Sequence, residues 1–212
     1  MTQADFEQVK EIIIAGRHKE IESVVTDLIA GGVDLHELIN YGMIAAMDVV
    51  GQRFARHEIF VPEMLVSALT MQKGLGLIKP LLKGDQTQTK ATVVLCTVKG
   101  DIHDIGKNLV GMMLEGGGFR VIDLGVNLSV EQLISQLKEI RPQVLGLSAL
   151  LTTTMPEMGK VIEALDAEGL RKSIKVMVGG APVDKRFADS IGADGYGADA
   201  AEAVRLARQF VE

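Results

Sequence analysis

One short segment, KGDIHDIG at residues 99–106, holds side chains whose types and spacing could do chemistry. Asp101 and His103 are two residues apart, so in an extended segment both side chains project on the same side. A carboxylate that accepts the proton of one ring nitrogen fixes the histidine tautomer and makes the other nitrogen a better metal ligand. The pair is therefore suited to holding a metal ion, or to acting as a catalytic base.

The segment by itself leaves other interpretations open. A lone histidine beside two aspartates is often a surface hydrogen bond or a helix cap. Because the segment has one histidine and no cysteine, a zinc site made by protein alone would need carboxylates from elsewhere. One protein ligand suffices if a macrocycle supplies the others. Asp104 and Lys107 are interpreted as solvated and are given no role.

Short apolar runs predict that this segment follows a buried strand. From Ala91 onward such runs alternate with amphipathic segments, which is typical of βα units on a parallel sheet. Helix starts are expected at the N-cap pairs Ser129–Gln132 and Asp199–Glu202, and near Pro156. The expected strands are 91–96, 120–124, 144–147 and 175–178, with a weak fifth strand near Gly195 and Tyr196.

In an open sheet of this Rossmann-like kind, ligands bind beyond the carboxyl ends of the strands. The loops 99–106, 148–154 and 179–182 each follow a predicted strand and are rich in glycine and small polar residues. We therefore expect these three loops to meet at one edge. Such loops could equally form a dinucleotide site, although GxGxxG is absent after the first strand.

The first 85 residues have helical periodicity instead. Phe6, Val9, Ile12 and Ile13 share one helical face, and the pattern repeats from Ile21 until two glycines end it at positions 31 and 32. A third helix is expected from a capping-box-like start at Asp34 and Glu37, and a fourth from Pro62 to about Leu82. The sequence thus predicts a four-helix bundle at 1–88 and an α/β domain at 89–212, with a boundary near Lys83 to Lys90.

Three motifs together resemble the cobalamin-binding domain of methionine synthase, B12-dependent mutases and the corrinoid proteins of methyltransferase systems. The signature of that family is DxHxxG, then SxL after about 41 residues, then GG after about 26 to 28 more. Here Asp101-x-His103-x-x-Gly106 is followed by 41 residues, Ser148-x-Leu150, 28 residues and Gly179-Gly180. The fold that the resemblance implies is a Rossmann-like, flavodoxin-like parallel sheet.

The resemblance also implies a role for each motif residue. His103 would replace the cofactor's own base as the lower axial ligand of cobalt, and Asp101 would accept the other N–H of its ring. The serine of SxL would join this polar network or contact the displaced nucleotide tail. The residues implied to bind the cofactor are Asp101, His103, Gly106, Ser148, Leu150, Gly179 and Gly180, with Thr152 as an additional polar contact.

The helical first part resembles the four-helix cap that precedes the cobalamin domain in methionine synthase and in methyltransferase corrinoid proteins. The stretch FVPEMLVSALTMQKG at 60–74 is similar to the cap segment that shields the methyl–cobalt bond. The residues implied to lie over the upper face are Phe60, Met64, Leu65 and Met71. Each of them, like Met43 and Met47, could instead be ordinary bundle core.

The two resemblances imply a corrinoid methyl carrier that is not catalytic alone. Its cofactor would be cobalamin or a related corrinoid, whose cobalt alternates between cob(I)alamin and methylcob(III)alamin. A substrate:corrinoid methyltransferase would load the methyl group, and a methylcorrinoid:acceptor methyltransferase would pass it to tetrahydrofolate or coenzyme M. A reductive activation protein is the third implied partner. The methyl donor could be methanol, a methylamine, glycine betaine or a methoxy-aromatic compound.

Two alternatives from other classes stay open. A B12-dependent sensor uses the same cap and cobalamin domain but normally adds a DNA-binding or output domain, for which we expect no spare length. A dinucleotide-dependent dehydrogenase with His103 as base would need a glycine fingerprint and an acidic partner for the ribose. Asp123 roughly fits the second requirement, but the fingerprint is missing.

Composition narrows the partners and the compartment. A net charge of −6 and the absence of tryptophan argue against a nucleic-acid partner. The single cysteine, Cys96, allows no internal disulfide and is expected to be a small buried hydrophobe. The polar, acidic start lacks a signal peptide, and charges or glycines interrupt every apolar stretch. We therefore expect a cytoplasmic protein without a membrane partner.

Overall fold

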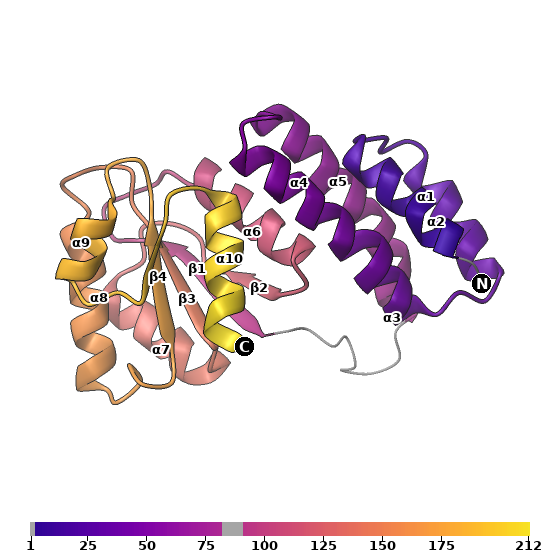
Figure 1. The fold of residues 1–212 in the computed structure, drawn as a ribbon. Coiled ribbons are helices and arrows are strands. Elements are labelled where there is room, and N and C mark those ends of the chain that lie inside the picture. Colours follow the sequence, from indigo (N-terminus) through magenta and orange to yellow (C-terminus); the bar gives the residue numbers. More distant parts are fainter. Residues whose placement is uncertain (1–2, 82–90) are drawn as a thin grey trace. The chain divides into compact units, whose positions relative to one another are not determined.

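The structure, a computed structural model, describes residues 3–81 and 91–212 and contains two compact units, a helical unit and an α/β unit (Figure 1). The helical unit precedes the gap and the α/β unit follows it. The boundary expected near Lys83 to Lys90 lies outside the described residues, as does the expected end of the fourth helix at Leu82. The exact domain limits, 1–88 and 89–212, therefore stay a prediction.

The helical unit has the four helical segments that the periodicity predicted. The side chain of Asp34 accepts hydrogen bonds from the backbone N–H groups of His36 and Glu37 and so starts the third segment. Pro62 lies in the first turn of the fourth. The segments are α1 (Gln3–Ile14), α2 (Ile21–Ala30), the run of α3 (Leu35–Glu37), η1 (Leu38–Ile44) and α4 (Ala45–Ala55), and α5 (Val61–Ile78) with the 3₁₀ turn η2 (Lys79–Leu81).

One detail of the helical unit was not predicted. The third segment is π-helical over η1, where the sequence pattern indicated an ordinary α-helix. A π-helix has wider turns than an α-helix and therefore changes which side chains share a face. Met43, inside this stretch, and Met47, in the turn that follows, are both buried.

The α/β unit is built on a five-stranded, fully parallel sheet with strand order β2-β1-β3-β4-β5. This confirms the predicted Rossmann-like, flavodoxin-like class. All five expected runs form strands, and their bounds differ from the prediction by at most one residue. The strands are β1 (Thr92–Thr97), β2 (Arg120–Asp123), β3 (Val144–Ser148), β4 (Lys175–Gly179) and β5 (Gly195–Gly197).

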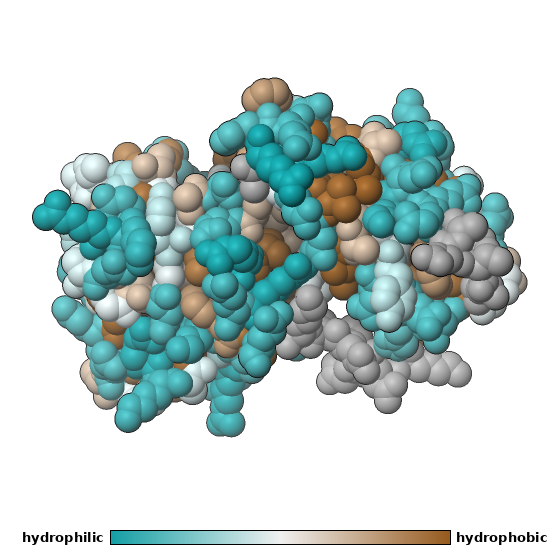
Figure 2. Space-filling model, in the orientation of Figure 1, coloured by the Kyte–Doolittle hydropathy of each residue, from teal (hydrophilic) through white to brown (hydrophobic). Residues whose placement is uncertain are grey.

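Helices cover both faces of the sheet, seen nearly edge-on in Figure 1. A core cluster joins alternate residues of β1, such as Val94 and Cys96, to α7, α8 and α9. On the other face, α10 buries small and apolar side chains, while hydrophilic residues predominate on its outward side in Figure 2. The helices are α6 (Ile105–Gly116), α7 (Val130–Ile140), α8 (Pro156–Ala167), α9 (Lys185–Ser190) and α10 (Ala200–Val211).

The predicted helix starts are confirmed. Ser129 and Gln132 form a reciprocal capping box at α7, and the Asp199 carboxylate accepts a hydrogen bond from the Glu202 N–H at α10. Cys96 is buried, and burial raises the pKa of its thiol to about 12, as expected for a small hydrophobe of the core. In the two described stretches, none of the helices combines the length and the apolar character that crossing a membrane requires.

Candidate functional site

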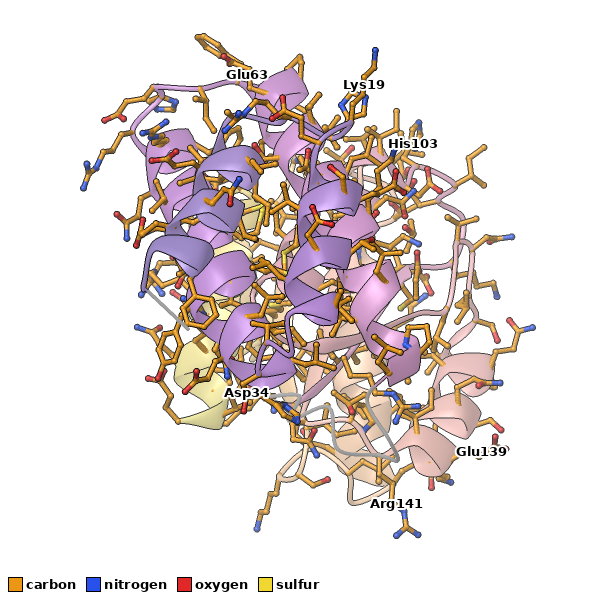
Figure 3. The ribbon with its side chains drawn as sticks, turned by 90° about the vertical axis from the view of Figure 1, so that its right-hand side faces the viewer. Lys19, Asp34, Glu63, His103, Glu139 and Arg141 are labelled. Atoms are coloured by element: carbon orange, nitrogen blue, oxygen red, sulfur yellow. The ribbon has the colours of Figure 1, made fainter. Side chains whose placement is uncertain are left out.

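The register of the sheet brings the ends of the central strands level with one another. Thr97 pairs with Ser148, Ser148 with Gly179, and Gly179 with Gly197. The loops that follow β1, β3 and β4 therefore leave the sheet at the same edge, as the sequence predicted. His103 lies at the periphery of the α/β unit in Figure 3, at the end opposite to Glu139 and Arg141 near the end of α7.

Asp101 and His103 form the contact that their spacing predicted. Nδ1 of His103 lies 2.7 Å from Oδ1 of Asp101, and the same oxygen accepts a hydrogen bond of 3.0 Å from the His103 backbone N–H. The Asp101 side chain is completely buried, whereas 47% of the His103 side chain is exposed. The imidazole is therefore anchored from the protein side and accessible from outside.

The second carboxylate oxygen of Asp101 binds the loop that follows β3. Oδ2 accepts hydrogen bonds from the backbone N–H groups of Leu150 at 2.8 Å and Leu151 at 3.1 Å. It also lies 2.9 Å from the hydroxyl of Thr154, which is buried. One carboxylate thus links the loops after β1 and β3, so the position of His103 depends on both.

These hydrogen bonds decide the charge of Asp101. Burial on its own would raise the pKa of the carboxyl group, but the hydrogen bonds from His103, Leu150 and Thr154 outweigh burial and hold the pKa well below its usual range. The carboxylate is therefore ionised at neutral pH and accepts the proton on Nδ1. The Nε2 lone pair is then available to a metal ion, as in metal-ligating histidines whose other nitrogen is held by a carboxylate.

The two loops joined by Asp101 also expose apolar side chains. Ile102 is 72% exposed and Ile105 86% exposed, and Leu150 and Leu151 from the next loop are exposed as well. Exposed apolar side chains gathered around one polar group mark a binding surface rather than ordinary exterior. The edge is therefore suited to a broad ligand with an apolar face that meets a single imidazole.

Ser148 and Thr152, the two residues predicted to make polar contacts from this loop, are not the ones whose hydroxyl meets Asp101. Within residues 91–212, the side-chain hydroxyl that binds Asp101 belongs to Thr154, and neither Ser148 nor Thr152 joins that carboxylate. Ser148 is half-buried, and Thr152 is exposed. The sequence analysis missed Thr154. Its only signal was its place among three consecutive threonines, and no spacing rule selects one of them. Contacts of Ser148 and Thr152 with a cofactor stay predictions.

The motif glycines differ in what a side chain would meet. A Cβ at Gly180 would lie 1.8 Å from the carbonyl oxygen of Ala149, and its φ of +129° is unfavourable for other residues. A Cβ at Gly179 would lie 3.0 Å from the carbonyl oxygen of Gly197. At Gly106 none of the residues that the structure describes would lie within 4 Å of a Cβ, so the absent side chain leaves room for a ligand. These glycines stay predicted contacts of the cofactor.

The interpretation of Lys107 as solvated is wrong. Its side chain is buried, and Nζ lies 2.5 Å from Oδ1 of Asp123 and 3.0 Å from the carbonyl oxygen of Gly125. The aliphatic part of the Lys107 side chain is buried, and the Asp123 carboxylate pairs with the charge of its ammonium group. Asp123, the acidic residue considered for a ribose, is thus already engaged by a lysine.

Of the expected cap residues, Phe60 lies just before α5 and the other three lie in its first and middle turns. Phe60, immediately before this helix, is 66% exposed, and its backbone N–H donates to the Glu63 carboxylate. Met64 and Met71 are buried, and Leu65 is half-buried. Burial suits the bundle-core interpretation of the two methionines. The proposed position of all four over a cofactor stays a prediction.

Comparison with known proteins agrees with this geometry. Two family models, each described as a B12 binding domain, match residues 91–205 and residues 5–79. A trimethylamine corrinoid protein from Methanosarcina barkeri is 42% identical over 199 residues, which are 93% of this chain and 92% of that protein. A corrinoid protein from Desulfitobacterium hafniense is 37% identical over 100% of this chain and 99% of its own.

Solved structures show the same similarity. A cobalamin-binding protein from Desulfitobacterium hafniense superposes with a TM-score of 0.82 at 33% identity, over 98% of each chain. A chain of the methanol:cobalamin methyltransferase complex MtaBC from Methanosarcina barkeri superposes with a TM-score of 0.88 at 30% identity, over 100% of this chain and 81% of that one. The chain therefore belongs to the B12-binding corrinoid proteins of methyltransferase systems, and it is a methyl-carrying corrinoid protein.

Proposed function

We propose that His103 is the lower axial ligand to the cobalt of a bound corrinoid, and that Asp101 holds the imidazole ready for that role. The observation that carries this proposal is the 2.7 Å contact between a fully buried carboxylate and a half-exposed imidazole. Since Asp101 is ionised and accepts the Nδ1 proton, Nε2 presents its lone pair outward. A corrin ring would supply the in-plane nitrogen ligands of the cobalt, so a single histidine from the protein is sufficient.

The surroundings of His103 fit a corrinoid in shape and in polarity. Ile102 and Ile105, the residue before His103 and the second residue after it, expose apolar surface that would suit the apolar face of a macrocycle. The open space at Gly106 allows a ligand to approach the first turn of α6. When bound, the corrinoid supplies a cobalt centre that can take up a methyl group and release it, chemistry that no side chain provides.

The partners of this chain follow from the same proposal. A substrate:corrinoid methyltransferase loads the methyl group, a methylcorrinoid:acceptor methyltransferase removes it, and a reductive activation protein restores the active cobalt. The similarity to a chain of a methanol:cobalamin methyltransferase complex supports the first of these. The cytoplasm is the compartment we propose. A methylated amine is the donor to test first, because relatives at 42% and 38% identity are trimethylamine and dimethylamine corrinoid proteins.

Reconstitution with hydroxocobalamin tests the proposal. The chain should retain the corrinoid stoichiometrically, and its visible spectrum should change in His103→Ala, which lacks the proposed ligand. His36→Ala is a matched control, because that histidine lies in the first turn of α3 in the helical unit. Its spectrum should equal that of the unmodified chain. An unchanged spectrum and unchanged methyl transfer in His103→Ala would overturn the axial assignment.

A further inference from the structure

The loop that follows β2, residues 124–128, holds the backbone of the segment that carries His103. The N–H of Asn127 donates a hydrogen bond of 3.0 Å to the carbonyl oxygen of Asp101. The side chain of Asn127 accepts a hydrogen bond of 2.8 Å from the N–H of Gly100. One residue therefore binds two consecutive residues just before His103.

The backbone of Asn127 is in the conformation that this double contact requires. Its φ of 56° is in the left-handed region, which asparagine adopts more readily than most other residues. The same loop is joined to β1 by hydrogen bonds from the Thr97 N–H to the Gly125 carbonyl and from the Leu128 N–H to the Thr97 carbonyl. These hydrogen bonds to β1 therefore hold the position of Asn127.

Lys107 anchors this loop from the other side of His103. Its buried Nζ binds the carboxylate of Asp123 and the carbonyl oxygen of Gly125. The Asp123 carboxylate also accepts the Gly125 N–H at 2.8 Å. Since Lys107 lies in the first turn of α6, the segment 100–107 is tied to the 124–128 loop both before and after its histidine.

We propose that Asn127 is a positioning residue for His103. It holds the Gly100–Asp101 backbone, this backbone directs the Asp101 carboxylate, and the carboxylate in turn sets the imidazole. The inference rests on the proposed function, because it concerns the geometry with which His103 meets cobalt. Because the loop is already ordered, the His103 imidazole keeps its orientation, and none of the free energy of corrinoid binding is needed to order the loop.

Three substitutions separate positioning from general stability. Asn127→Gly keeps access to positive φ but removes the acceptor for the Gly100 N–H. Asn127→Asp keeps an acceptor oxygen and should restore the contact. Ser129→Ala is the control, because it removes the hydroxyl that accepts the Gln132 N–H in the capping box of α7, two residues further on.

Two measurements read out the effect. Amide hydrogen exchange of Gly100 in the corrinoid-free chain reports directly on the hydrogen bond to Asn127. The visible spectrum of the hydroxocobalamin-loaded chain reports the fraction of cobalt that His103 coordinates. In Asn127→Gly we expect faster exchange at Gly100 and about 10-fold weaker histidine coordination, the lower end of the loss when a supporting partner of a metal ligand is removed. Asn127→Asp should lie near the unmodified chain in both.

The outcomes distinguish this inference from the proposed function. One outcome is that His103→Ala changes the visible spectrum of the loaded chain, while Asn127→Gly and Ser129→Ala give the same spectrum as each other. Asn127 then does not position His103, and the inference alone fails. A spectrum that does not respond to His103→Ala overturns the proposed function and this inference together.

Discussion

The hydroxyl of Thr154 lies 2.9 Å from Oδ2 of Asp101, although 53 residues of sequence separate the two. Both side chains are buried. The hydroxyl also lies 2.8 Å from the carbonyl oxygen of Leu151, but it has one proton to donate. The ionised carboxylate is the stronger acceptor, so the bond to Asp101 carries more of the interaction.

Thr154→Val, which removes this hydroxyl but keeps the shape of the side chain, should destabilise the chain. A hydrogen bond to a charged group contributes about 1–3 kcal/mol, and we expect a loss of that size in the free energy of unfolding by urea. Thr152→Val is the matched control: the residue is exposed, and the expected change is within about 0.5 kcal/mol. Equal losses in the two variants would contradict the role of Thr154.

Because the pKa of Asp101 is lowered in the folded chain, the free energy of unfolding should depend on pH in the acidic range. In the unfolded chain an aspartate titrates at about 3.9. Because the pKa of Asp101 in the folded chain is lower, its contribution is fully present above about pH 4 and is lost as pH falls toward the folded pKa. In Asp101→Asn, unfolding free energies measured from pH 7 to pH 3 should be lower at neutral pH and should fall less with acid.

The control for this pH series is Asp189→Asn, a substitution at an exposed aspartate of α9. Its acid dependence should follow that of the unmodified chain. If Asp101→Asn loses stability with acid as steeply as the unmodified chain, Asp101 is not the source of the dependence.

Gly106→Leu should separate folding from corrinoid binding. Within residues 3–81 and 91–212 no atom lies within 4 Å of a Cβ at this position, so the thermal unfolding midpoint should not fall. A leucine would fill the space left for the ligand. If overpacking costs about 1–3 kcal/mol, the dissociation constant for hydroxocobalamin should rise about 5- to 150-fold.

Gly76→Leu is the matched control, because that glycine lies in α5 and a Cβ there also meets nothing within 4 Å. It should leave the dissociation constant unchanged. An unaltered dissociation constant in Gly106→Leu would remove Gly106 from the binding surface.

Two lysine–carboxylate pairs of similar length should differ in their effect on stability. Lys107 and Asp123 are 2.5 Å apart with the lysine buried, whereas Lys138 and Glu168 are 2.6 Å apart with both side chains exposed. Lys107→Met should cost about 1–3 kcal/mol of unfolding free energy, because buried hydrogen bonds to charged groups are lost. Lys138→Met should cost less than about 1 kcal/mol, as is usual for exposed pairs. Urea unfolding of both variants measures the two losses, and an equal or reversed order would contradict the assignment.

Much of this protein could be predicted from local pattern. The apolar runs predicted where the strands lie, and the N-cap pairs predicted where helices begin, because alternation and capping depend on neighbours a few residues away. The carboxylate–imidazole contact of Asp101 and His103 was equally predictable, since a single residue separates them in the sequence. The convergence of three loops followed from parallel pairing, which places the carboxyl ends of all strands at one edge.

Only the tertiary structure decided which distant residues complete the site. Thr154 and not Thr152 meets Asp101, and Asn127 holds the Gly100–Asp101 backbone across 27 residues. Lys107 is buried because Asp123 and the loop after β2 close over it. These contacts form between side chains and backbone groups of separate loops, so they depend on how the loops are placed in space. The sequence determined by itself the fold and the carboxylate–imidazole pair, because both arise from short-range chemistry, whereas the support around that pair arises from packing.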